Sequence, residues 1–421
     1  MSFAATARRP EVWASPEPTV ARIDAVRFRD QIAETGHEAR EDDIDLLAGL
    51  GVRSTRYPVL WEKVAPRCPE ARDYRWAQRR LSALAERGVE PIVTLLHHGS
   101  GPAYTNLLDP AFPRLFADYA EATARRFPWV RRWTPINEPL TTARFSMLYA
   151  AWYPNRFFDD SAFACAIVNE ALAIASAQER IRAIVPDAAF LLTEDLQSFT
   201  AADRHVEAYV EHKRDRMYLS CELLQGRVVE GHPMHRYLVE RGGIEPAVLE
   251  RLARSPQPPD VMGWNYYPNS ERWLESDGQG GHRNLGLVDV APERMSMLDA
   301  LLRANARLGL PVALSEVHVL GNERERARWM LQRFADALAA RGQGVPVVAF
   351  GAWAAFGMVD WVSLLARREQ ACEDGVYTCA GPGGRPEPTL VAAVVRELAA
   401  GRVPEAPSEF GWWERGRVAV A

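Results

Sequence analysis

The chain has 421 residues, of which 48% are hydrophobic and 25% are charged, and these values are ordinary for a globular protein that buries a sizeable core. Its 50 basic and 55 acidic residues give a net charge of −5 and are spread along the whole chain. Because neither sign forms a long block, we expect no nucleic-acid partner and no anionic membrane as a partner.

The first 20 residues lack the apolar core of a secretion signal, because Glu11, Pro16, Glu17 and Pro18 interrupt every candidate. The longest apolar stretch, residues 347–359, contains two glycines and is shorter than the ~20 residues that a membrane helix needs. Five cysteines stand at wide spacing without a close pair, so we interpret them as reduced thiols: Cys68, Cys165, Cys221, Cys372 and Cys379. These features together predict a cytoplasmic protein.

Short apolar runs alternate with amphipathic segments from one end of the chain to the other, a pattern typical of β/α units around a parallel sheet. Eight of these runs have the character of strands buried on both faces: residues 11–14, 52–57, 91–97, 130–137, 189–193, 261–266, 312–316 and 347–353. Barrels of this kind reach over 400 residues with insertions. We therefore predict a single eight-stranded parallel (β/α) TIM barrel with loop insertions, comprising residues 1–421 and ending in a short C-terminal tail from about residue 403.

Between the runs, apolar residues recur at helical spacing. Residues 112–127 form one apolar stripe, and residues 77–85 form another that stops before Gly88. The polar, glycine-rich segment 278–294 is predicted to be a loop insertion. Trp412 and Trp413 are interpreted as anchors that dock the tail rather than as sugar-binding residues.

Polar and aromatic residues gather where the predicted strands end, and in a β/α barrel these ends form the active site. The residues at these ends are Arg56 and Tyr57, His97 and His98, Asn137 and Glu138, Asn265, Tyr266 and Tyr267, Glu316 and His318, and Trp353. Two carboxyl groups among aromatic rings and a guanidinium are the groups that glycoside hydrolysis requires. Taken alone, Glu138 is best explained as a salt-bridging residue or as a residue at a helix start. His97 alone is best explained as a core histidine, and Trp353 alone as part of the barrel core. Because all three occur together at strand ends, an active site is the favoured interpretation.

The segment Trp133-Thr-Pro-Ile-Asn-Glu-Pro139 resembles the acid/base signature of glycoside hydrolase family 1, the β-glucosidase family. Further segments are similar to motifs of the same family, in the same order along nearly the whole chain: Arg56-Tyr-Pro-Val-Leu-Trp61, Thr94-Leu-Leu-His97, Gly263-Trp-Asn-Tyr-Tyr267, Leu314-Ser-Glu316, Trp353 and Asp360-Trp361. The resemblance implies a retaining enzyme that acts by double displacement on a β-glycosidic bond. Glu316 would be the nucleophile and Glu138 the acid/base, with their carboxyl groups about 5 to 5.5 Å apart.

The resemblance also implies roles for neighbouring residues. Arg56 would favour the ionised form of Glu316, Tyr267 would donate a hydrogen bond to it, and Asn137 would hold the sugar 2-hydroxyl. The remaining substrate-binding or supporting candidates are His97, His98, Asn265, His318, Trp353, Asp360 and Trp361. The implied substrate partner is a small-molecule glycoside or oligosaccharide, and no cofactor is expected.

Several positions depart from the family pattern. Ala21 or Arg22 stands about where the first strand supplies a glutamine, so no glutamine is available there. His98 replaces a tryptophan, Asp360 replaces a glutamate, and Val317-His318 replaces Asn-Gly. Because these changes concern sugar recognition rather than the reaction, we expect a glycone other than plain glucose.

Two further features remain open. Glu194 and Asp195 add carboxylates near the rim, and a helix N-terminal charge or a salt bridge explains them at least as well as a functional role. The histidines lack metal-ligand spacing, so no metal site is expected.

Alternative functions are a transglycosidase or a sugar-tailoring enzyme in a biosynthetic pathway, and a catalytically silent sugar-binding barrel. An unrelated barrel enzyme, such as an aldolase or a metal-dependent hydrolase, is disfavoured because no lysine and no metal cluster stands at the strand ends.

Overall fold

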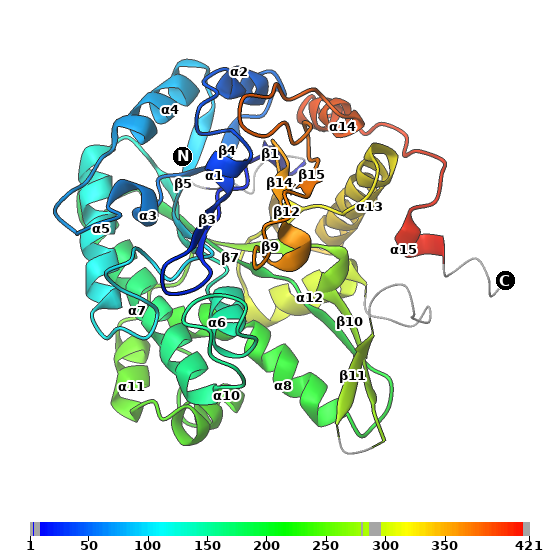
Figure 1. Cartoon of the computed structure of the whole chain (residues 1–421). Helices are drawn as coiled ribbons and strands as arrows, with labels where there is room; N and C mark the ends of the chain where they lie inside the picture. Colours follow the sequence, from blue (N-terminus) through cyan, green and yellow to red (C-terminus); the bar gives the residue numbers. More distant parts are fainter. Residues whose placement is uncertain (1–2, 4–8, 279–280, 286–295, 416–421) are drawn as a thin grey trace.

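The computed structural model describes residue 3 and residues 9–278, 281–285 and 296–415, and its centre is a closed barrel of eight parallel strands (Figure 1). Around the barrel the order is β1, β13, β12, β9, β7, β6, β5 and β4. The strands are β1 (Glu11–Ala14), β4 (Ser54–Pro58), β5 (Glu90–His97), β6 (Arg132–Asn137), β7 (Ala189–Asp195), β9 (Val261–Tyr266), β12 (Val312–Val317) and β13 (Val347–Ala352). All eight predicted strands are present, and the predicted fold class is confirmed.

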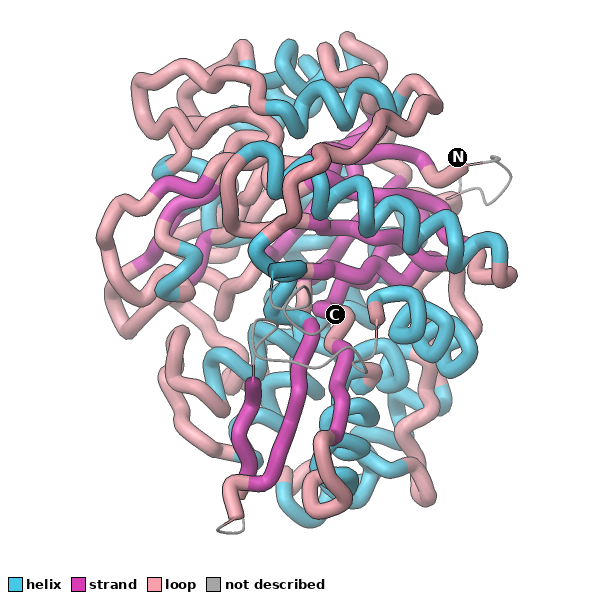
Figure 2. Tube along the Cα trace, turned by 90° about the vertical axis from the view of Figure 1, so that its right-hand side faces the viewer, coloured by secondary structure: helices cyan, strands magenta, loops and turns pink. Residues whose placement is uncertain are grey.

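Helices surround the barrel, and the strands lie inside them (Figure 2). The helices are α1 (Gln31–Glu34), α2 (Asp43–Ala48), α3 (Trp61–Val64), α4 (Arg75–Glu86), α5 (Phe112–Arg126), α6 (Pro139–Met147), α7 (Asp160–Ile184), α8 (Glu207–Met217), α9 (Leu219–Leu224), α10 (Pro233–Arg236), α11 (Pro246–Arg254), α12 (Met297–Leu308), α13 (Glu323–Gly342), α14 (Leu390–Ala399) and α15 (Trp412–Arg415). Short 3₁₀ turns occur at Pro268–Ser270 and Trp361–Ser363, and a π-helical turn at Tyr237–Arg241. The two apolar stripes predicted as helices correspond to α5 and α4, and Gly88 follows α4 with a positive φ of 70°.

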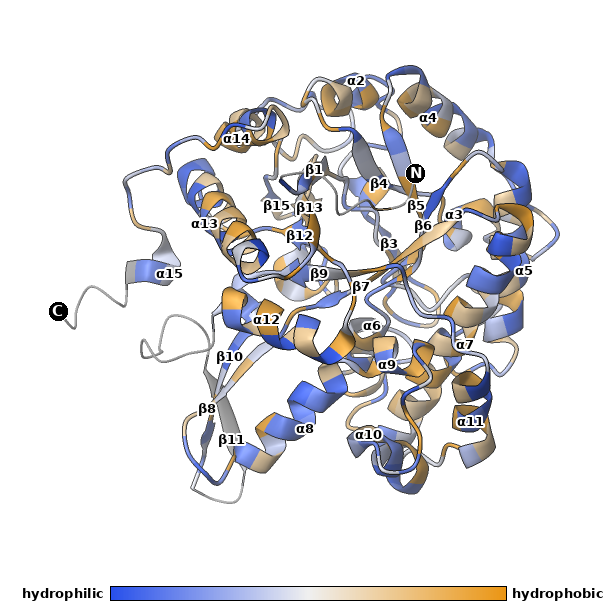
Figure 3. Ribbon diagram, turned by 180° about the vertical axis from the view of Figure 1, so that it is seen from behind, coloured by the Kyte–Doolittle hydropathy of each residue, from blue (hydrophilic) through white to orange (hydrophobic). Residues whose placement is uncertain are grey.

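Apolar burial explains this arrangement. Apolar residues from six barrel strands cluster together: Trp13, Ile92, Leu191, Val261, Ala313 and Ala349 are among them. A much larger cluster joins the barrel strands to the surrounding helices. In Figure 3, α12 and α13 show both hydrophobic and hydrophilic positions, as expected of amphipathic helices against a core.

Helix α7 is the one helix among the described residues that is long and apolar enough to cross a membrane by length and composition. It packs against α5 and α6, and 56% of its most apolar window is buried inside the molecule. The core helix of a barrel meets the same criteria, so this finding is weak evidence for a membrane span.

Three small sheets extend the loops of the barrel. They are β2 (Val20–Arg22) with β3 (Phe28–Asp30), β14 (Met358–Val359) with β15 (Cys372–Glu373), and a three-stranded sheet of β8 (Ser198–Ala201), β10 (Glu271–Ser276) and β11 (His282–Leu285). The loop predicted for residues 278–294 is therefore wrong at His282–Leu285, because antiparallel pairing with β10 supplies the hydrogen bonds that composition does not reveal. Residues 279–280 and 286–294 of that prediction lie outside the described residues.

The C-terminal segment docks on α13, as its two tryptophans predict. Trp413 is 3% exposed and packs edge-on against Trp329, while Glu414 forms an ion pair with Arg328 at 2.6 Å. All five cysteines are unpaired.

Candidate active site

The carboxyl ends of the barrel strands open into a cavity of about 400 Å³. Of the residues predicted from the sequence, the cavity lining includes His98, Glu138, Tyr267, Glu316, His318 and Trp361. Arg56, His97, Asn137, Asn265 and Trp353 are buried beside these residues and contact them or one another. The barrel thus brings eleven of the twelve predicted residues together, and Asp360 is the exception.

Glu138 lies at the junction of β6 and α6 in a left-handed conformation, with φ 45° and ψ 59°. Such a conformation is uncommon for a residue other than glycine and is held by its surroundings. The Glu138 N–H donates to the Thr193 carbonyl at 3.0 Å, and Asn265 Nδ2 donates to Glu138 Oε1 at 2.6 Å. Burial raises the pKa of Glu138 well above its ordinary value, and the negative charges of Glu316, Asp195 and Glu194 add to this effect.

Glu316 lies on β12 in a different electrostatic environment. Arg56 Nη1 donates to Glu316 Oε1 at 2.5 Å, and the Tyr267 hydroxyl donates to Oε2 at 2.5 Å. Burial raises the pKa of Glu316, whereas the guanidinium of Arg56 and the hydrogen bond from Tyr267 oppose that rise. The ionised form of Glu316 is therefore stabilised by direct partners that Glu138 lacks.

A β-bulge aims Glu316 into the site. The pairing of β12 with β9 shifts between Leu314 and Glu316, so that two residues of β12 advance against one of β9. Leu314 packs in the core, and the intervening Ser315 donates to Asn265 Oδ1 at 2.6 Å. Asn265 consequently links the two glutamate-bearing strands, as bulges near active sites often re-aim a side chain.

Every hydrogen-bonding position of the Asn137 amide is occupied. Its Oδ1 accepts from Arg56 Nη2 at 2.5 Å and from Thr193 Oγ1 at 2.8 Å. Its Nδ2 contacts the Nε2 atoms of His97 and His98 at 3.1 and 3.2 Å. Because an amide has two donors and two acceptor lone pairs, Asn137 can bond to a further group only if it releases one of these four contacts.

The two histidines are neutral. Burial lowers the pKa of His98 to about 3, with a further contribution from Arg56, and burial also lowers the pKa of His97 well below its ordinary value. The 3.6 Å approach of His98 Nε2 to Glu138 Oε2 is therefore a contact with a neutral ring and not an ion pair. His98 therefore supplies hydrogen-bonding groups and no positive charge.

Aromatic rings and a third histidine, His318, form the rest of the inner wall. The rings of Trp353 and His97 stack with centroids 5.7 Å apart, and Arg56 lies over the Trp353 ring at 5.2 Å. His318 Nδ1 lies 2.8 Å from the Trp353 carbonyl, and its Nε2 lies 2.6 Å from Glu373 Oε1. Trp361 meets His98 edge-on at 5.6 Å.

Glu17 is a site residue that the sequence analysis missed. Its carboxylate lines the cavity, accepts from Trp353 Nε1 at 3.1 Å and lies 3.8 Å from His97 Nε2. Neither Ala21 nor Arg22 reaches the cavity, because Ala21 is buried in an apolar cluster and Arg22 stacks on Tyr153. The irregular chain after β1 thus provides a glutamate four residues before Ala21, at a position that sequence spacing does not predict.

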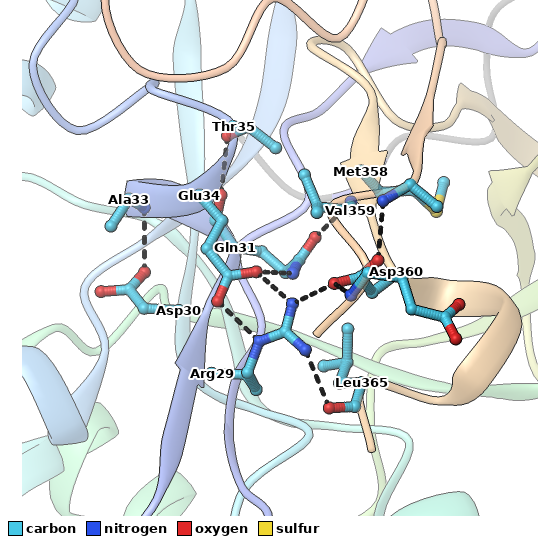
Figure 4. Close-up of polar contacts among 12 residues, drawn as sticks. Arg29, Asp30, Gln31, Ala33, Glu34, Thr35, Met358, Val359, Asp360 and Leu365 are labelled. Atoms are coloured by element: carbon cyan, nitrogen blue, oxygen red, sulfur yellow. Dashed lines mark hydrogen bonds and ion pairs between the residues drawn. The ribbon is translucent and has the colours of Figure 1, made fainter. Parts of the chain in front are cut away.

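Asp360 does not line the cavity, which corrects its predicted place among the substrate-binding residues. Figure 4 shows its carboxylate facing Arg29, which lies between Asp360 and Glu34. Arg29 Nη2 donates to Asp360 Oδ2 at 2.8 Å, and the Glu369 and Ala371 N–H groups donate at 3.1 and 2.8 Å. Because φ of Asp360 is 59°, the backbone turns this side chain away from the site and toward the β3 segment.

Glu194 and Asp195 differ in position. Glu194 is buried and accepts the Leu140 N–H at 2.7 Å, which is the helix N-terminal role that the sequence left open. Asp195 lines the cavity and accepts hydrogen bonds from Ser270 Oγ and, at 2.9 Å, from Gln197 Nε2. Within the part of the chain that the structure describes, no group of three or more His, Cys, Asp or Glu side chains is arranged to hold a metal ion.

These features define a parallel β/α-barrel protein with two buried glutamates across one cavity. Residues 5–283 match the model of glycosyl hydrolase family 1, and the chain belongs to this family. The matched range contains Glu138 and ends before Glu316, so the second glutamate is located by the barrel geometry.

Relatives and solved structures agree with this family. The chain is 30% identical over 148 residues to "Beta-glucosidase 40" of Arabidopsis thaliana, covering 33% of this chain and 29% of the relative. It is 26% identical over 159 residues to "Beta-glucosidase 16" of the same plant, and the matched part spans 31% of that relative's length and 35% of this chain. The fold is similar to that of a family 1 β-glucosidase from Thermotoga maritima, with a TM-score of 0.73 and 16% identity over 94% of this chain and 98% of that one. Another relative is named "Probable inactive beta-glucosidase 14" of Oryza sativa subsp. japonica, at 26% identity over 27% of this chain and 24% of the relative.

Proposed function

We propose that this protein is a retaining β-glycosidase in which Glu316 is the nucleophile and Glu138 is the acid/base. One observation carries the proposal: two buried glutamates border one cavity in different electrostatic environments. Glu316 receives a guanidinium and a phenol, whereas Glu138 is surrounded by further carboxylates that favour its protonated form. When the surroundings of two carboxyl groups give them different pKa values, the group with the higher pKa is the acid and the group that stays ionised is the base or nucleophile.

The reaction takes two steps. In the first, ionised Glu316 forms a bond to the anomeric carbon, the glycosidic C–O bond breaks, and the proton of Glu138 moves to the departing oxygen. In the second, ionised Glu138 takes a proton from water, the water oxygen bonds to the anomeric carbon, and the ester bond to Glu316 breaks. Configuration at the anomeric carbon is retained.

Trapping the glycosyl-enzyme tests this function. Incubation with 2,4-dinitrophenyl 2-deoxy-2-fluoro-β-glycosides of gluco, galacto and fuco configuration should add the mass of one sugar, and peptide mapping should place it on Glu316. The matched control is Glu373→Gln, since this carboxylate borders the same cavity and plays no part in the proposed displacement. A label on Glu373, or no label with any of the three sugars, would rule out the assignment.

We further propose that the preferred glycone is not plain glucose. The carboxylate of Asp360 is bonded to Arg29 and does not line the cavity, whereas Glu17 and His98 do line the cavity. A sugar hydroxyl that finds no hydrogen-bond partner in the site raises the free energy of the transition state by on the order of 1 to 3 kcal/mol. Measuring kcat/KM for aryl β-glucoside, β-galactoside, β-fucoside and amino-sugar glycosides tests this, and the highest value with the glucoside would contradict it.

A further inference from the structure

Four basic side chains from three elements lie together outside the lining of the active-site cavity: Arg144 of α6, Lys213 and Arg216 of α8, and Arg272 of β10. We call them the basic cluster. Helix α8 packs against β10 through apolar side chains that include Val210 and Leu274, and in the view of Figure 1 it lies between α6 and β10. The positive charges of all three arginines consequently act on Lys213.

Two arginines of the basic cluster are buried without a carboxylate partner. Arg144 is 3% exposed and Arg216 is 5% exposed, yet neither forms an ion pair with any residue that the structure describes. Arg144 Nε is also without a hydrogen-bond partner among those residues. By contrast, the buried Arg29 pairs with Asp360 at 2.8 Å. Because a buried cation without a counter-charge is costly, a negative group from outside the described chain would stabilise the basic cluster.

The two partly exposed members of the basic cluster have the same character. Neither Lys213 nor Arg272 forms an ion pair with a residue of the described ranges, and Asp195 acts on Arg272 through its charge alone. Burial and, after it, the positive charges of Arg216, Arg144 and Arg272 lower the pKa of Lys213 to about 6. The surroundings of this ammonium group therefore favour the approach of a negative charge.

Tyr149 is the point at which the basic cluster reaches the surface, since this side chain is 41% exposed. Its hydroxyl oxygen accepts a hydrogen bond from Arg216, which leaves the hydroxyl proton for another acceptor. Partial burial raises the pKa of Tyr149, but the positive charges of Arg144 and Arg216 outweigh burial and lower it. The guanidinium carbon of Arg144 lies 5.9 Å from the centre of the Tyr149 ring. An anion that approaches past Tyr149 therefore meets a hydroxyl donor and positive charge.

We propose that the basic cluster binds a phosphate or sulfate group at a site separate from the cavity that holds Glu138 and Glu316. Guanidinium groups donate paired N–H groups that match the oxygens of such anions, and the compact ammonium group of a lysine adds a further charge. A doubly charged group with several oxygens accepts from several of these donors at once, whereas a carboxylate has one charge and two oxygens. The bound group is either a free ion or an ester on a larger ligand, since both present the same oxygens.

Titration calorimetry with sodium sulfate tests this site directly. The parent protein in Tris-chloride buffer, with the ionic strength held constant by sodium chloride, should bind sulfate at a single saturable site. Sulfate should also raise Tm, because a ligand that binds only the folded protein stabilises it. Since no turnover is measured, the result is independent of the proposed glycosidase function. Glu316→Gln should bind sulfate as the parent does, because Glu316 lies in the separate cavity.

Variants of the basic cluster locate the bound anion. Lys213→Met, Arg216→Gln and Arg272→Gln should each weaken sulfate binding at least about tenfold, because each removes a charge-assisted contact. Arg216→Gln changes a buried side chain, so Lys213→Met and Arg272→Gln decide the test if that variant does not fold. The control is Arg236→Gln, which removes a positive charge from a side chain that is 82% exposed and pairs with Glu240 at 2.7 Å. This control should bind sulfate as tightly as the parent.

The increase of Tm with sulfate should be smaller in the three variants of the basic cluster than in the parent and in Arg236→Gln. Sulfate also stabilises proteins in general because it is excluded from their surface. That effect is common to the parent and all variants, so it cancels in the comparison.

Inorganic phosphate and phenyl phosphate then separate the two sources of the anion. Equal or tighter binding of phenyl phosphate would assign the site to an ester on a larger ligand, and weaker binding would assign it to a free ion. Absence of saturable sulfate and phosphate binding in the parent would overturn the proposal. Equal affinity for sulfate in the parent, Lys213→Met and Arg272→Gln would overturn it as well, since the anion would then bind elsewhere.

Discussion

At the scale of single residues, the site consists of two carboxyl groups whose chemistry is set by their neighbours. Glu316 shares its two oxygens between Arg56 and Tyr267, whereas Glu138 receives one amide and faces negative charge. Identical side chains thus acquire different roles from their surroundings.

Removal of the nucleophile should be partly reversible by a small anion. Glu316→Gly is expected to lose at least about 10³-fold in kcat on an aryl glycoside, because the covalent step is lost. Azide should restore part of the activity and yield a glycosyl azide of inverted configuration, detectable by NMR. Glu373→Gln is the control, and full activity in Glu316→Gln would contradict the nucleophile assignment.

Loss of the acid should depend on the leaving group. Glu138→Gln retains the contact with Asn265 but cannot donate a proton, so turnover of a poor leaving group should fall about 10²-fold to 10⁴-fold. Turnover of a 2,4-dinitrophenyl glycoside should fall far less. Equal losses across a series of aryl leaving groups would argue against an acid role.

Glu17 should determine the choice of glycone. Glu17→Gln preserves size but removes the charge next to Trp353 and His97, so kcat/KM should fall about tenfold on the best glycone and the ranking of glycones should change. Asp360→Asn is the matched control, since its side chain faces Arg29 and not the cavity. Asp360→Asn should reduce the stability of the protein and leave the ranking of glycones intact. A changed ranking in Asp360→Asn would mean that Asp360 does contact the substrate.

At the scale of secondary-structure elements, the residue that precedes α6 is not the residue whose side chain caps this helix. Glu138 is the N-cap residue of α6 but makes no side-chain capping bond; instead Glu194 of β7 accepts the Leu140 N–H. A helix N-terminus leaves N–H groups without partners, and the neighbouring strand satisfies one of them here. The side chain of Glu138 is thereby free to point at Asn265 and the cavity.

Removal of this substitute cap should harm both stability and catalysis. Glu194→Ala is expected to cost about 0.5 to 2 kcal/mol in the free energy of unfolding, as for other helix caps. It should also lower kcat selectively for poor leaving groups, because Glu138 begins the helix that loses its cap. Glu194→Gln keeps an acceptor oxygen and should recover most of both losses in urea melts and leaving-group series. Equal kinetic losses for good and poor leaving groups would mean that Glu194 serves the fold alone.

At the scale of the whole molecule, folding buries carboxyl groups without cationic partners. Burial raises the pKa of Glu17 to about 7 and that of Glu62 and Glu194 to about 8. These values exceed the ordinary 4.5 of the unfolded chain, so these three groups bind more protons in the folded protein than in the unfolded chain between pH 4.5 and about 8.

Stability should therefore fall as pH rises through this range. The contribution of the three groups is fully present below pH 4.5 and is lost as pH passes their folded pKa values of about 7 and 8. Thermal melts from pH 5 to 8.5 should show Tm decreasing by several degrees. Glu62→Gln, which removes one of these carboxyl groups away from the nucleophile, should flatten the decrease; an identical pH slope in this variant would contradict the prediction.

The sequence by itself determined the barrel and the two glutamates that border its cavity. Eight apolar runs between amphipathic helices permit few other folds, and polar residues at strand ends must meet because parallel strands end on one face. Strand-end positions, together with the resemblance to family motifs, selected Glu138, Arg56 and Tyr267 as site candidates.

Only the tertiary structure decided what surrounds these residues. The irregular chain after β1 places Glu17 at the site, Asp360 has a positive φ and its carboxylate bonds to Arg29, and the bulge on β12 sets the position of Glu316. The contact of Trp412 with Leu320 joins segments 92 residues apart. Sequence periodicity reports which face of a strand or helix a residue occupies, whereas loops, bulges and distant contacts depend on three-dimensional packing that no local pattern encodes.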